Sequence, residues 1–477
     1  MSHYCEMSVL CFFFLLAFPT LSAAAGACHA DDHAALLSFK SAIKHDPTKI
    51  LATWKSGTDC CTWNGITCGD TKRVTTLFLS APSDQPGAYL SGHISPAVSK
   101  LRFLTGFYLI DLKNISGRIP DSIFTLTDLH YIYLENNKLS GLIPYAVGNL
   151  TKLEVLSLTG NRFVGRIPTT IAGLSQMNQL KLGGNLLHGP FPAAIKNLTT
   201  LTYLSLENNM LTGNIPDIFS SFKKLLFLYL NGNSFTGRIP ASIASLAPTL
   251  VDLKLGHNNL TGQIPEFLSK FKSLDTLDLS RNGFTGTVPK SFSNLTKIFN
   301  LDLSRNLLVD PFPELFVKGI ESLDLSYNRF NLGSIPKWVQ SSPIIYSLKL
   351  AKCGLKMKIE DFKPAQTYFY DYIDLSDNEI TGSPVQLINA TNFLVGFYGS
   401  GNQLKFDFEK LRFSATLTEL DLSRNLVYGK VPSGVAQLKK LNVSYNRLCG
   451  KLPTTSFPAS AFVGNACLCG SPLGACK

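Results

Sequence analysis

The sequence lacks the local motifs by which the common classes of enzyme are recognised. It contains no glycine-rich loop of the kind that binds phosphate, no G-x-S-x-G nucleophile motif and no H-E-x-x-H zinc motif. No histidine is spaced with the cysteines as a zinc site requires. We therefore predict that the protein is not an enzyme and has no catalytic residue, no metal and no cofactor.

Long hydrophobic runs are also missing. The apolar run from Val9 to Phe18 is too short to span a bilayer comfortably, and no later run is long enough. Small residues from Ser22 to Ala27 offer cleavage sites, so residues 1–25 are predicted to be a signal peptide, although no Lys or Arg precedes the run. The sequence ends at Lys477 without a retention signal or lipid-anchor tail. We expect a soluble protein, secreted to the extracellular space, with no membrane span.

Acidic residues are fewer than basic ones, 33 against 44, which gives a formal net charge of +11. In a secreted protein this charge does not indicate a nucleic-acid partner. It favours acidic partners at long range. Because the basic residues are scattered rather than clustered, direct binding of an acidic polysaccharide is the weaker interpretation.

The cysteines that follow the apolar run lie mainly at the two ends of the chain. The adjacent Cys60 and Cys61 cannot easily bond to each other, so each is expected to bond to a cysteine further away. The simplest pairing is Cys28–Cys60, Cys61–Cys68, Cys449–Cys467 and Cys469–Cys476. The sequence does not fix this connectivity. An oxidising compartment favours disulfides over a zinc site.

Seven N-x-S/T sequons indicate that the surface carries N-linked glycans if the protein is secreted. One of them, at Asn442, falls within a predicted strand and is the least certain acceptor. The sequons begin at Asn114, Asn149, Asn197, Asn259, Asn294, Asn389 and Asn442.

Between the two cysteine clusters the chain repeats itself about every 24 residues. LHYIYLENNKLSGLIP, LEVLSLTGNRFVGRIP, LTYLSLENNMLTGNIP and LDTLDLSRNGFTGTVP are four of the units. This pattern is a leucine-rich repeat. In a later unit, NLLVDPFP, Asp310 replaces the repeat glycine. The regular glycines are Gly117, Gly141, Gly165, Gly189, Gly213, Gly237, Gly262 and Gly286.

The repeat predicts an α/β fold, a right-handed leucine-rich-repeat solenoid with a concave parallel β-sheet. Each L-x-L segment is a short strand with two leucines on one face, and stacked units share those leucines as one core. The repeated asparagine is expected to satisfy backbone groups in the turn that follows. Disulfide-bonded caps should cover the ends: we expect an N-terminal cap over residues 26–80, about fifteen repeats over residues 81–448 and a C-terminal cap over residues 449–477.

The N-terminal cap is predicted to contain a short helix that begins at Asp31 and Asp32. Leu36, Phe39 and Ile43 are spaced to lie on one face of that helix. Trp54, Trp63 and the nearby disulfides should complete the cap. One cysteine outside the caps, Cys353, occupies the position of the repeat asparagine, and we interpret it as a buried free thiol.

The concave face should present residues that depart from the default repeat, and these are candidates for partner binding. Tyr203 and Phe227 occupy equivalent positions on neighbouring strands, so their rings should lie about 5 Å apart. Such rings could form a hot spot, stack on sugar rings, or simply stabilise the sheet. Counting back from each repeat asparagine identifies Tyr131, Tyr133, Gln179, Lys181, Tyr203, Phe227, Tyr229, Asp252 and Lys254.

Two further groups of residues are predicted on the same face. Tyr370, Tyr372 and Tyr398 form a second, weaker aromatic group. Paired carboxylates could suggest a glycosidase. The aspartates of this face, however, belong to the ordinary repeat phrase LDLS or its variant IDLS. We expect them to lie in open solvent, with no cleft that would raise a pKa. They are Asp278, Asp302, Asp324, Asp374 and Asp421.

The L-x-G-x-I-P repeat is similar to that of plant extracellular leucine-rich-repeat proteins. The two caps resemble those of polygalacturonase-inhibiting proteins of plant cell walls. The matching segments are DDHAALLSFKSAIKHDPTKILATWKSGTDCCTWNGITC and ACLCGSPLGACK. Those inhibitors carry about ten repeats, and the extra, irregular units over residues 310–413 are similar to receptor-like proteins.

The resemblance implies recognition of a partner through the concave face. The first hypothesis is plant defence, by inhibition of a microbial wall-degrading glycosidase such as a polygalacturonase. The alternative is a module that recognises a peptide or wall oligosaccharide together with the ectodomain of a membrane receptor kinase. A structural wall component held by its positive charge is a third possibility.

Overall fold

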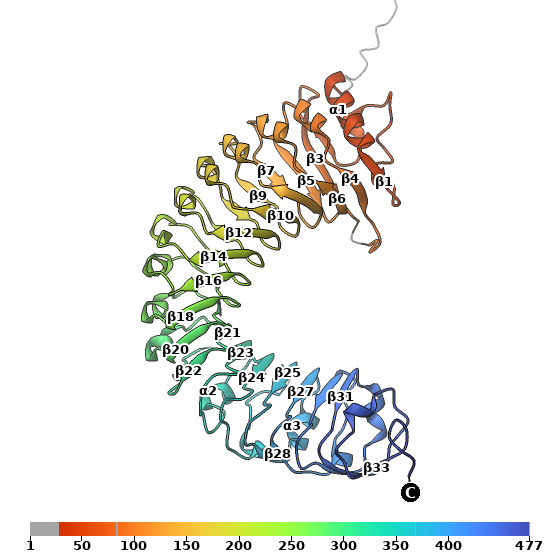
Figure 1. The fold of residues 1–477 in the computed structure, drawn as a ribbon, viewed down its shortest axis with the longest axis vertical. Coiled ribbons are helices and arrows are strands. Elements are labelled where there is room, and N and C mark those ends of the chain that lie inside the picture. Colours follow the sequence, from red (N-terminus) through yellow and green to blue (C-terminus); the bar gives the residue numbers. More distant parts are fainter. Residues whose placement is uncertain (1–27, 83, 318, 368, 477) are drawn as a thin grey trace, which may run out of the picture.

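The chain winds into a curved solenoid (Figure 1). The computed structural model describes residues 28–476, apart from residues 83, 318 and 368. The predicted signal peptide lies outside the described residues. Strands line the inner side of the arc and short helices its outer side (Figure 1).

A long sheet forms the concave face. Within the described residues it contains sixteen parallel strands, β3 to β31, against about fifteen expected, and β2 joins β3 in antiparallel orientation. Its strands are β2 Ile66–Cys68, β3 Val74–Ser80, β5 Gly106–Ile110, β7 Tyr131–Tyr133, β9 Val155–Ser157, β11 Gln179–Lys181, β13 Tyr203–Ser205, β15 Phe227–Tyr229, β17 Asp252–Lys254, β19 Thr276–Asp278, β21 Asn300–Asp302, β23 Ser322–Asp324, β24 Ser347–Lys349, β25 Tyr372–Asp374, β27 Gly396–Tyr398, β29 Glu419–Asp421 and β31 Lys440–Asn442.

A second sheet follows the repeat turns, and this sheet was not predicted from the sequence. It is parallel apart from the antiparallel pair β1 and β4, and it stops at β22, where Asp310 replaces the repeat glycine. Its strands are β1 Ile43–His45, β4 Leu90–His93, β6 Lys113–Gly117, β8 Lys138–Leu142, β10 Arg162–Gly165, β12 Leu186–Pro190, β14 Met210–Asn214, β16 Ser234–Gly237, β18 Asn259–Gln263, β20 Gly283–Thr287 and β22 Leu307–Val309.

Past β22 the second layer of pairing continues only in fragments among the described residues. A two-stranded and a three-stranded sheet stand in its place, and isolated bridges such as Val309 to Arg329 and Gly333 to Leu355 lie between. The strands of these small sheets are β26 Thr381–Gly382, β28 Gln403–Leu404, β30 Tyr428–Gly429, β32 Arg447–Lys451 and β33 Cys467–Cys469.

Short helices connect the sheets on the convex side. Most are single 3-10 turns that begin directly after the repeat proline, because proline's fixed φ suits the residue that precedes a helix. The α-helices are α1 Ala30–Ser41, α2 Lys337–Gln340 and α3 Val385–Ala390. The 3-10 helices are η1 Cys60–Thr62, η2 Pro96–Lys100, η3 Asp121–Thr125, η4 Tyr145–Asn149, η5 Thr169–Gly173, η6 Ala193–Asn197, η7 Phe219–Ser221, η8 Ala241–Leu246, η9 Glu266–Lys270, η10 Lys290–Asn294, η11 Ile359–Asp361, η12 Phe408–Lys410, η13 Ser433–Gln437 and η14 Ala459–Ala461.

The repeat asparagines form the ladder that was predicted from their spacing. The side-chain amide of Asn258 donates to the carbonyl oxygens of Leu230, Leu255 and Gly256 at 3.0–3.2 Å, and its Oδ1 accepts the N–H of Phe235. One asparagine thus satisfies four backbone groups in two successive repeats. The same pattern recurs along the solenoid and ties each turn to the next.

The N-terminal cap covers the first repeats with α1 and two stacked indoles. Leu36 and Phe39 are fully buried, and the rings of Trp54 and Trp63 stack at 5.5 Å. The prediction for Ile43 was wrong: α1 ends at Ser41, and Ile43 begins β1, where pairing with β4 replaces the helical hydrogen bonds.

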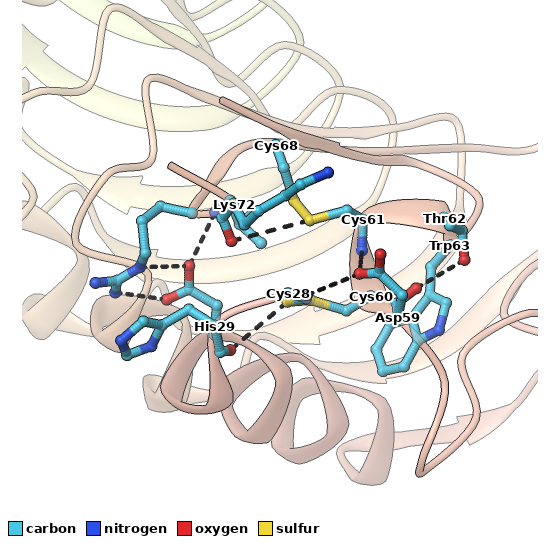
Figure 2. Close-up of a disulfide and its surroundings, with 12 residues drawn as sticks. Cys28, His29, Asp59, Cys60, Cys61, Thr62, Trp63, Cys68 and Lys72 are labelled. Atoms are coloured by element: carbon cyan, nitrogen blue, oxygen red, sulfur yellow. Dashed lines mark hydrogen bonds and ion pairs between the residues drawn. A yellow bond between two sulfur atoms is a disulfide. The ribbon is translucent and has the colours of Figure 1, made fainter. Parts of the chain in front are cut away.

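Four disulfides staple the two ends, and they join the pairs that the sequence favoured: Cys28–Cys60, Cys61–Cys68, Cys449–Cys467 and Cys469–Cys476. Figure 2 shows how Asp59 holds the N-terminal pair in place. Its carboxylate accepts the N–H groups of Cys28 and Cys61 at 2.9 and 3.0 Å. These bonds, that of Cys61 first, lower the pKa of Asp59 below its ordinary value.

Cys353 is buried and forms no disulfide with any cysteine that the structure describes, as the sequence indicated. Its thiol donates to the carbonyl oxygens of Leu325 and Ala351 at 3.4 and 3.6 Å, so it partly replaces the asparagine amide. Burial raises the pKa of the Cys353 thiol, which keeps it protonated and unreactive.

Candidate functional site

The concave sheet presents two columns of side chains to the inside of the arc. In most strands the middle residue is buried in the core, and the first and third residues are half-buried on the opposite face. Parallel pairing places Gln179, Tyr203, Phe227 and Asp252 in one column. The second column passes from Lys181 through Ser205 and Tyr229 to Lys254.

Three aromatic rings meet at the centre of this surface. The centroids of Tyr203 and Phe227 lie 5.3 Å apart, as expected from their register, and Tyr229 meets Tyr203 edge-on at 5.3 Å. Phe227 and Tyr229 are 6.3 Å apart on the same strand, β15. The rings therefore form one packed cluster across β13 and β15.

Charged residues surround the cluster. Lys181 Nζ lies 4.8 Å from the ring centre of Tyr203, and Lys254 Nζ lies 4.5 Å from that of Tyr229. The Tyr229 hydroxyl donates to Asp252 at 2.8 Å. Burial, together with this bond, raises the pKa of Tyr229 above its ordinary value, so the hydroxyl stays a donor.

Seven side chains that β11, β13, β15 and β17 present on the inside of the arc form a surface that we call the concave patch. Its rings are braced by one another and by the lysines, and the Tyr229 hydroxyl is bonded to Asp252. The surface is therefore preorganised, and a ligand would meet it with little loss of side-chain freedom. The patch consists of Gln179, Lys181, Tyr203, Phe227, Tyr229, Asp252 and Lys254.

Two of the predicted residues, Tyr131 and Tyr133, do not join this patch. Strand β9, with Val155 and Ser157 in the same columns, separates them from β11. The Tyr131 hydroxyl donates to Glu154 at 3.1 Å, which raises the pKa of Tyr131.

Tyr133 belongs to a separate aromatic group that was not predicted from the sequence. Its ring stacks on that of Tyr108, with 5.3 Å between the ring centres. The ring centre of Tyr108 in turn lies 5.4 Å from that of Phe78, and the Phe78 side chain is 44% exposed. Counting back from the repeat asparagine failed here because Leu112 replaces that asparagine. Aligning the buried middle residue of each strand would have found both rings.

The row of aspartates on the following strands contradicts the prediction of open solvent. Asp278, Asp302 and Asp324 share one register on β19, β21 and β23, and all are half-buried. Burial, and then the nearby charge of Asp302, raise the pKa of Asp324 to about 6. The same two causes oppose ionisation of Asp278 and raise its pKa. The prediction was wrong because the phrase LDLS describes one repeat alone, whereas these carboxylates are half-buried and stacked on neighbouring strands.

Asp302 and Asp324, together with Asp374, border a hollow of about 490 Å³ on the concave face. Lys349, Arg281 and Arg305 bring positive charge to the same hollow, and the guanidinium of Arg305 lies 4.3 Å from the ring centre of Tyr327. The hollow thus carries charges of both signs, beside the more aromatic concave patch.

The predicted aromatic group of Tyr370, Tyr372 and Tyr398 is only partly present. Tyr370 is buried in the core against Phe362, so its assignment to the surface was wrong. The irregular unit places Tyr370 before its strand, where a large ring fills the interior. Tyr372 and Tyr398 do line the hollow. The Tyr398 hydroxyl donates to Glu419.

The seven sequons differ in exposure. Those at Asn149, Asn197, Asn259 and Asn294 have exposed asparagines, and three of these end convex 3-10 helices at equivalent repeat positions. Asn114, Asn389 and Asn442 are half-buried. The Asn442 side chain accepts bonds from both the N–H and the hydroxyl of Ser444.

Family models match the chain from its first cap to its last repeats. The leucine rich repeat N-terminal domain matches residues 29–69. Two leucine-rich-repeat models match residues 113–163, 175–235 and 248–308, and residues 319–342 and 437–457. Together these segments cover more than half of the chain. The chain is a leucine-rich-repeat protein.

Among curated relatives, this leucine-rich-repeat protein is 40% identical to polygalacturonase inhibitor 2 of Arabidopsis thaliana over 113 residues, which are 22% of this chain and 34% of the inhibitor. It is 39% identical to the DNA damage-repair/toleration protein DRT100 of the same plant over 120 residues, 23% of this chain and 32% of that protein. The chain thus spans about a third of the length of these relatives.

Solved plant receptors share the fold of this leucine-rich-repeat protein over most of its length. The ectodomain of the Arabidopsis thaliana receptor kinase GASSHO1/SCHENGEN3, in complex with CASPARIAN STRIP INTEGRITY FACTOR 2, is 29% identical with a TM-score of 0.54 and covers 81% of this chain and 55% of that one. The plant peptide hormone receptor RGFR1, in complex with RGF2, is 25% identical with a TM-score of 0.53 and covers 82% and 81%. Among the described residues, no helix has the length and apolar character needed to cross a membrane.

Proposed function

We propose that this leucine-rich-repeat protein is an extracellular, non-catalytic protein of the plant cell wall that binds a protein partner on the concave patch. The observation that carries the proposal is the packed cluster of Tyr203, Phe227 and Tyr229, braced by two lysines on a rigid sheet. Aromatic side chains with charged neighbours are the residues that dominate protein–protein affinity.

A protein partner fits the patch better than a wall polysaccharide does. Sugar rings stack on free aromatic faces. Here Lys181 lies over the ring of Tyr203 and Lys254 over that of Tyr229, and the three rings contact one another. Ring edges, a tyrosine hydroxyl and charged groups remain for a partner, a mixture that suits a polar protein surface.

The proposed activity is inhibition of a microbial wall-degrading enzyme, such as a polygalacturonase, in plant defence. It rests on the likeness to the polygalacturonase inhibitors over 22–23% of this chain. The mechanism would be occlusion: the concave sheet covers the substrate cleft of the hydrolase or its rim. No cofactor or reacting group of this chain is needed.

The test is inhibition of a panel of purified fungal polygalacturonases by the native protein and by Phe227→Ala/Tyr229→Ala. We expect at least one enzyme to be inhibited, and the inhibition constant to rise at least ten-fold in the double variant. Ser347→Ala, on the same column of the concave sheet, is the matched control and should inhibit normally. Undiminished activity of every enzyme in the panel would refute the proposal.

A second candidate function is a module that recognises a peptide or oligosaccharide together with a receptor-kinase ectodomain. The hollow of about 490 Å³ favours it, because its charges of both signs suit the charged groups of a short ligand. The fold likeness to the peptide receptor RGFR1 covers 82% of this chain. Binding on a peptide array that is lost in Arg305→Ala but retained in the Phe227/Tyr229 variant would favour this function over the first.

A further inference from the structure

The repeats before Glu207 are unusual in their charge. Between residues 136 and 206 the sequence contains six Lys or Arg and a single acidic residue, Glu154. In the whole chain the numbers of basic and acidic residues are much closer, 44 and 33. This part of the solenoid therefore carries a local positive field that salt screens only partly at short range.

The second sheet exposes an apolar strip in these same repeats. Leu142, Val164 and Leu186 are direct partners in the register of β8, β10 and β12, and their side chains are 56%, 38% and 44% exposed. Met210, 48% exposed, continues the strip on β14 beside His188. Four adjacent strands thus place large apolar side chains in contact with water, where scattered single ones would be usual.

A hollow of about 720 Å³ lies at the β8 end of the strip. Leu142, Val164 and Tyr145 line it, and the Tyr145 ring is 66% exposed. Arg118 borders the hollow, and its side chain lies along the repeat glycine Gly141. An apolar side chain of a partner could be buried there beside a guanidinium.

Basic residues flank the strip along its own strands, and the acidic residue Asp121 lines the hollow at its β8 end. Lys138 and Arg162 begin β8 and β10, Arg166 directly follows β10, and all three are exposed. Strands β8, β10, β12 and β14 contain no Asp or Glu. A second copy of this chain would bring the same positive charges to the contact, so self-association on this face is disfavoured.

The predicted glycans would leave this face open. The sequon at Asn114 lies on β6 and that at Asn259 on β18, on either side of β8 to β16. Asn149 and Asn197 end the 3-10 helices η4 and η6. The strands that carry the apolar strip themselves have no sequon.

We infer that the outer face of β8, β10, β12 and β14 is a second binding surface, for an acidic segment of a protein that carries apolar side chains. Three strand spacings of about 4.8 Å give a strip roughly 14 Å long, which matches four to five residues of extended chain. Alternating apolar and acidic residues would bury Leu or Phe on the strip and pair Asp or Glu with Arg162 and Lys138. The inference is independent of the concave patch and of the enzyme inhibited there.

The probe that tests it is a displayed library of random twelve-residue peptides, selected on the full-length secreted protein. Peptides are sorted by their dependence on Val164→Glu and Arg162→Glu, each of which should weaken binding at least ten-fold. Thr285→Glu is the matched control, because Thr285 follows the buried Phe284 on β20 as Val164 follows the buried Phe163 on β10. Circular dichroism and the melting temperature show whether each variant is folded.

The expected result is a set of peptides enriched in Asp and Glu together with Leu, Phe or Trp. They should bind Thr285→Glu and the Phe227→Ala/Tyr229→Ala variant as well as the native protein. The inference is overturned if folded Val164→Glu and Arg162→Glu lose no peptides. It is also overturned if the peptides they lose are neutral or basic, or if a selected peptide induces dimers through this face.

Discussion

Replacing Asp324 with asparagine should stabilise the protein at neutral pH. The pKa of Asp324 is raised from its ordinary value of 3.8 to about 6 by burial and by the neighbouring Asp302. Asparagine has the same shape, and its Oδ1 can still accept the N–H of Ser326, which Asp324 accepts at 2.9 Å. The substitution therefore removes the buried charge and keeps the hydrogen bond.

The size and sign of the effect follow from proton linkage. A pKa that is raised on folding means that the folded state binds more protons between pH 3.8 and about 6, so stability falls as the pH rises through that window. Above it the ionised carboxylate costs about 3 kcal/mol, since each pKa unit is worth about 1.4 kcal/mol. Asp324→Asn should thus gain about 3 kcal/mol at pH 7 and less than about 1 kcal/mol at pH 4.

The assay is urea unfolding of the native protein and the variant at pH 7 and pH 4. Asp421→Asn is the matched control: Asp421 Oδ1 accepts the N–H of Ser423 at 2.9 Å in the same way, but its neighbours in the column are Tyr398 and Asn442 rather than a carboxylate. The difference between pH 7 and pH 4 should be much larger for Asp324 than for Asp421. Equal stability of the Asp324 variant and the native protein at pH 7 would refute the reasoning.

Three other predictions concern single side chains. Cys353→Asn should raise the free energy of unfolding by about 1 kcal/mol, because the new Oδ1 could accept the N–H of Phe330, which has no acceptor among the described residues; thermal unfolding beside Cys353→Ser checks this. Asn258→Ala should cost roughly 1–3 kcal/mol in chemical unfolding, because it leaves the N–H of Phe235 without its side-chain acceptor, and a loss under about 0.5 kcal/mol would contradict the ladder. The carbonyl oxygens of Leu230, Leu255 and Gly256 each keep one other donor. Glycopeptide mass spectrometry should find a glycan at the exposed Asn149 and none at Asn442, whose side chain bonds to its own sequon serine; a fully occupied Asn442 would show that these bonds do not protect it.

The parts of the fold that repeat were open to prediction from the sequence. The leucine spacing indicated the concave strands, and the asparagine spacing indicated the ladder, because each depends on contacts between equivalent positions of successive units. The contact between Tyr203 and Phe227 followed from the same register. Adjacent cysteines limited the disulfides to a few simple pairings.

What the sequence did not indicate depends on collective packing. The pKa of Asp324 rises because neighbouring side chains exclude water and because Asp302 lies on the next strand, and neither fact is visible in one repeat. Tyr108 was missed because Leu112 breaks the repeat used for counting. The exposed strip from Leu142 to Met210 belongs to a sheet whose existence the L-x-L pattern does not announce.

The end of the second sheet at β22 has a mechanical consequence. Repeats of a solenoid are stabilised by their nearest neighbours. Past Val309 the second sheet no longer joins them continuously, and at Cys353 a thiol takes the place of an asparagine amide. The solenoid is thus weakened at two nearby places, Val309 and Cys353. The parts of the chain before Val309 and after Cys353 should unfold as separate cooperative units. The charged hollow spans this weakened segment, because Asp302 precedes the segment and Asp374 follows it. A ligand that contacts both carboxylates would occupy this surface and would also fix the angle between the two parts of the solenoid.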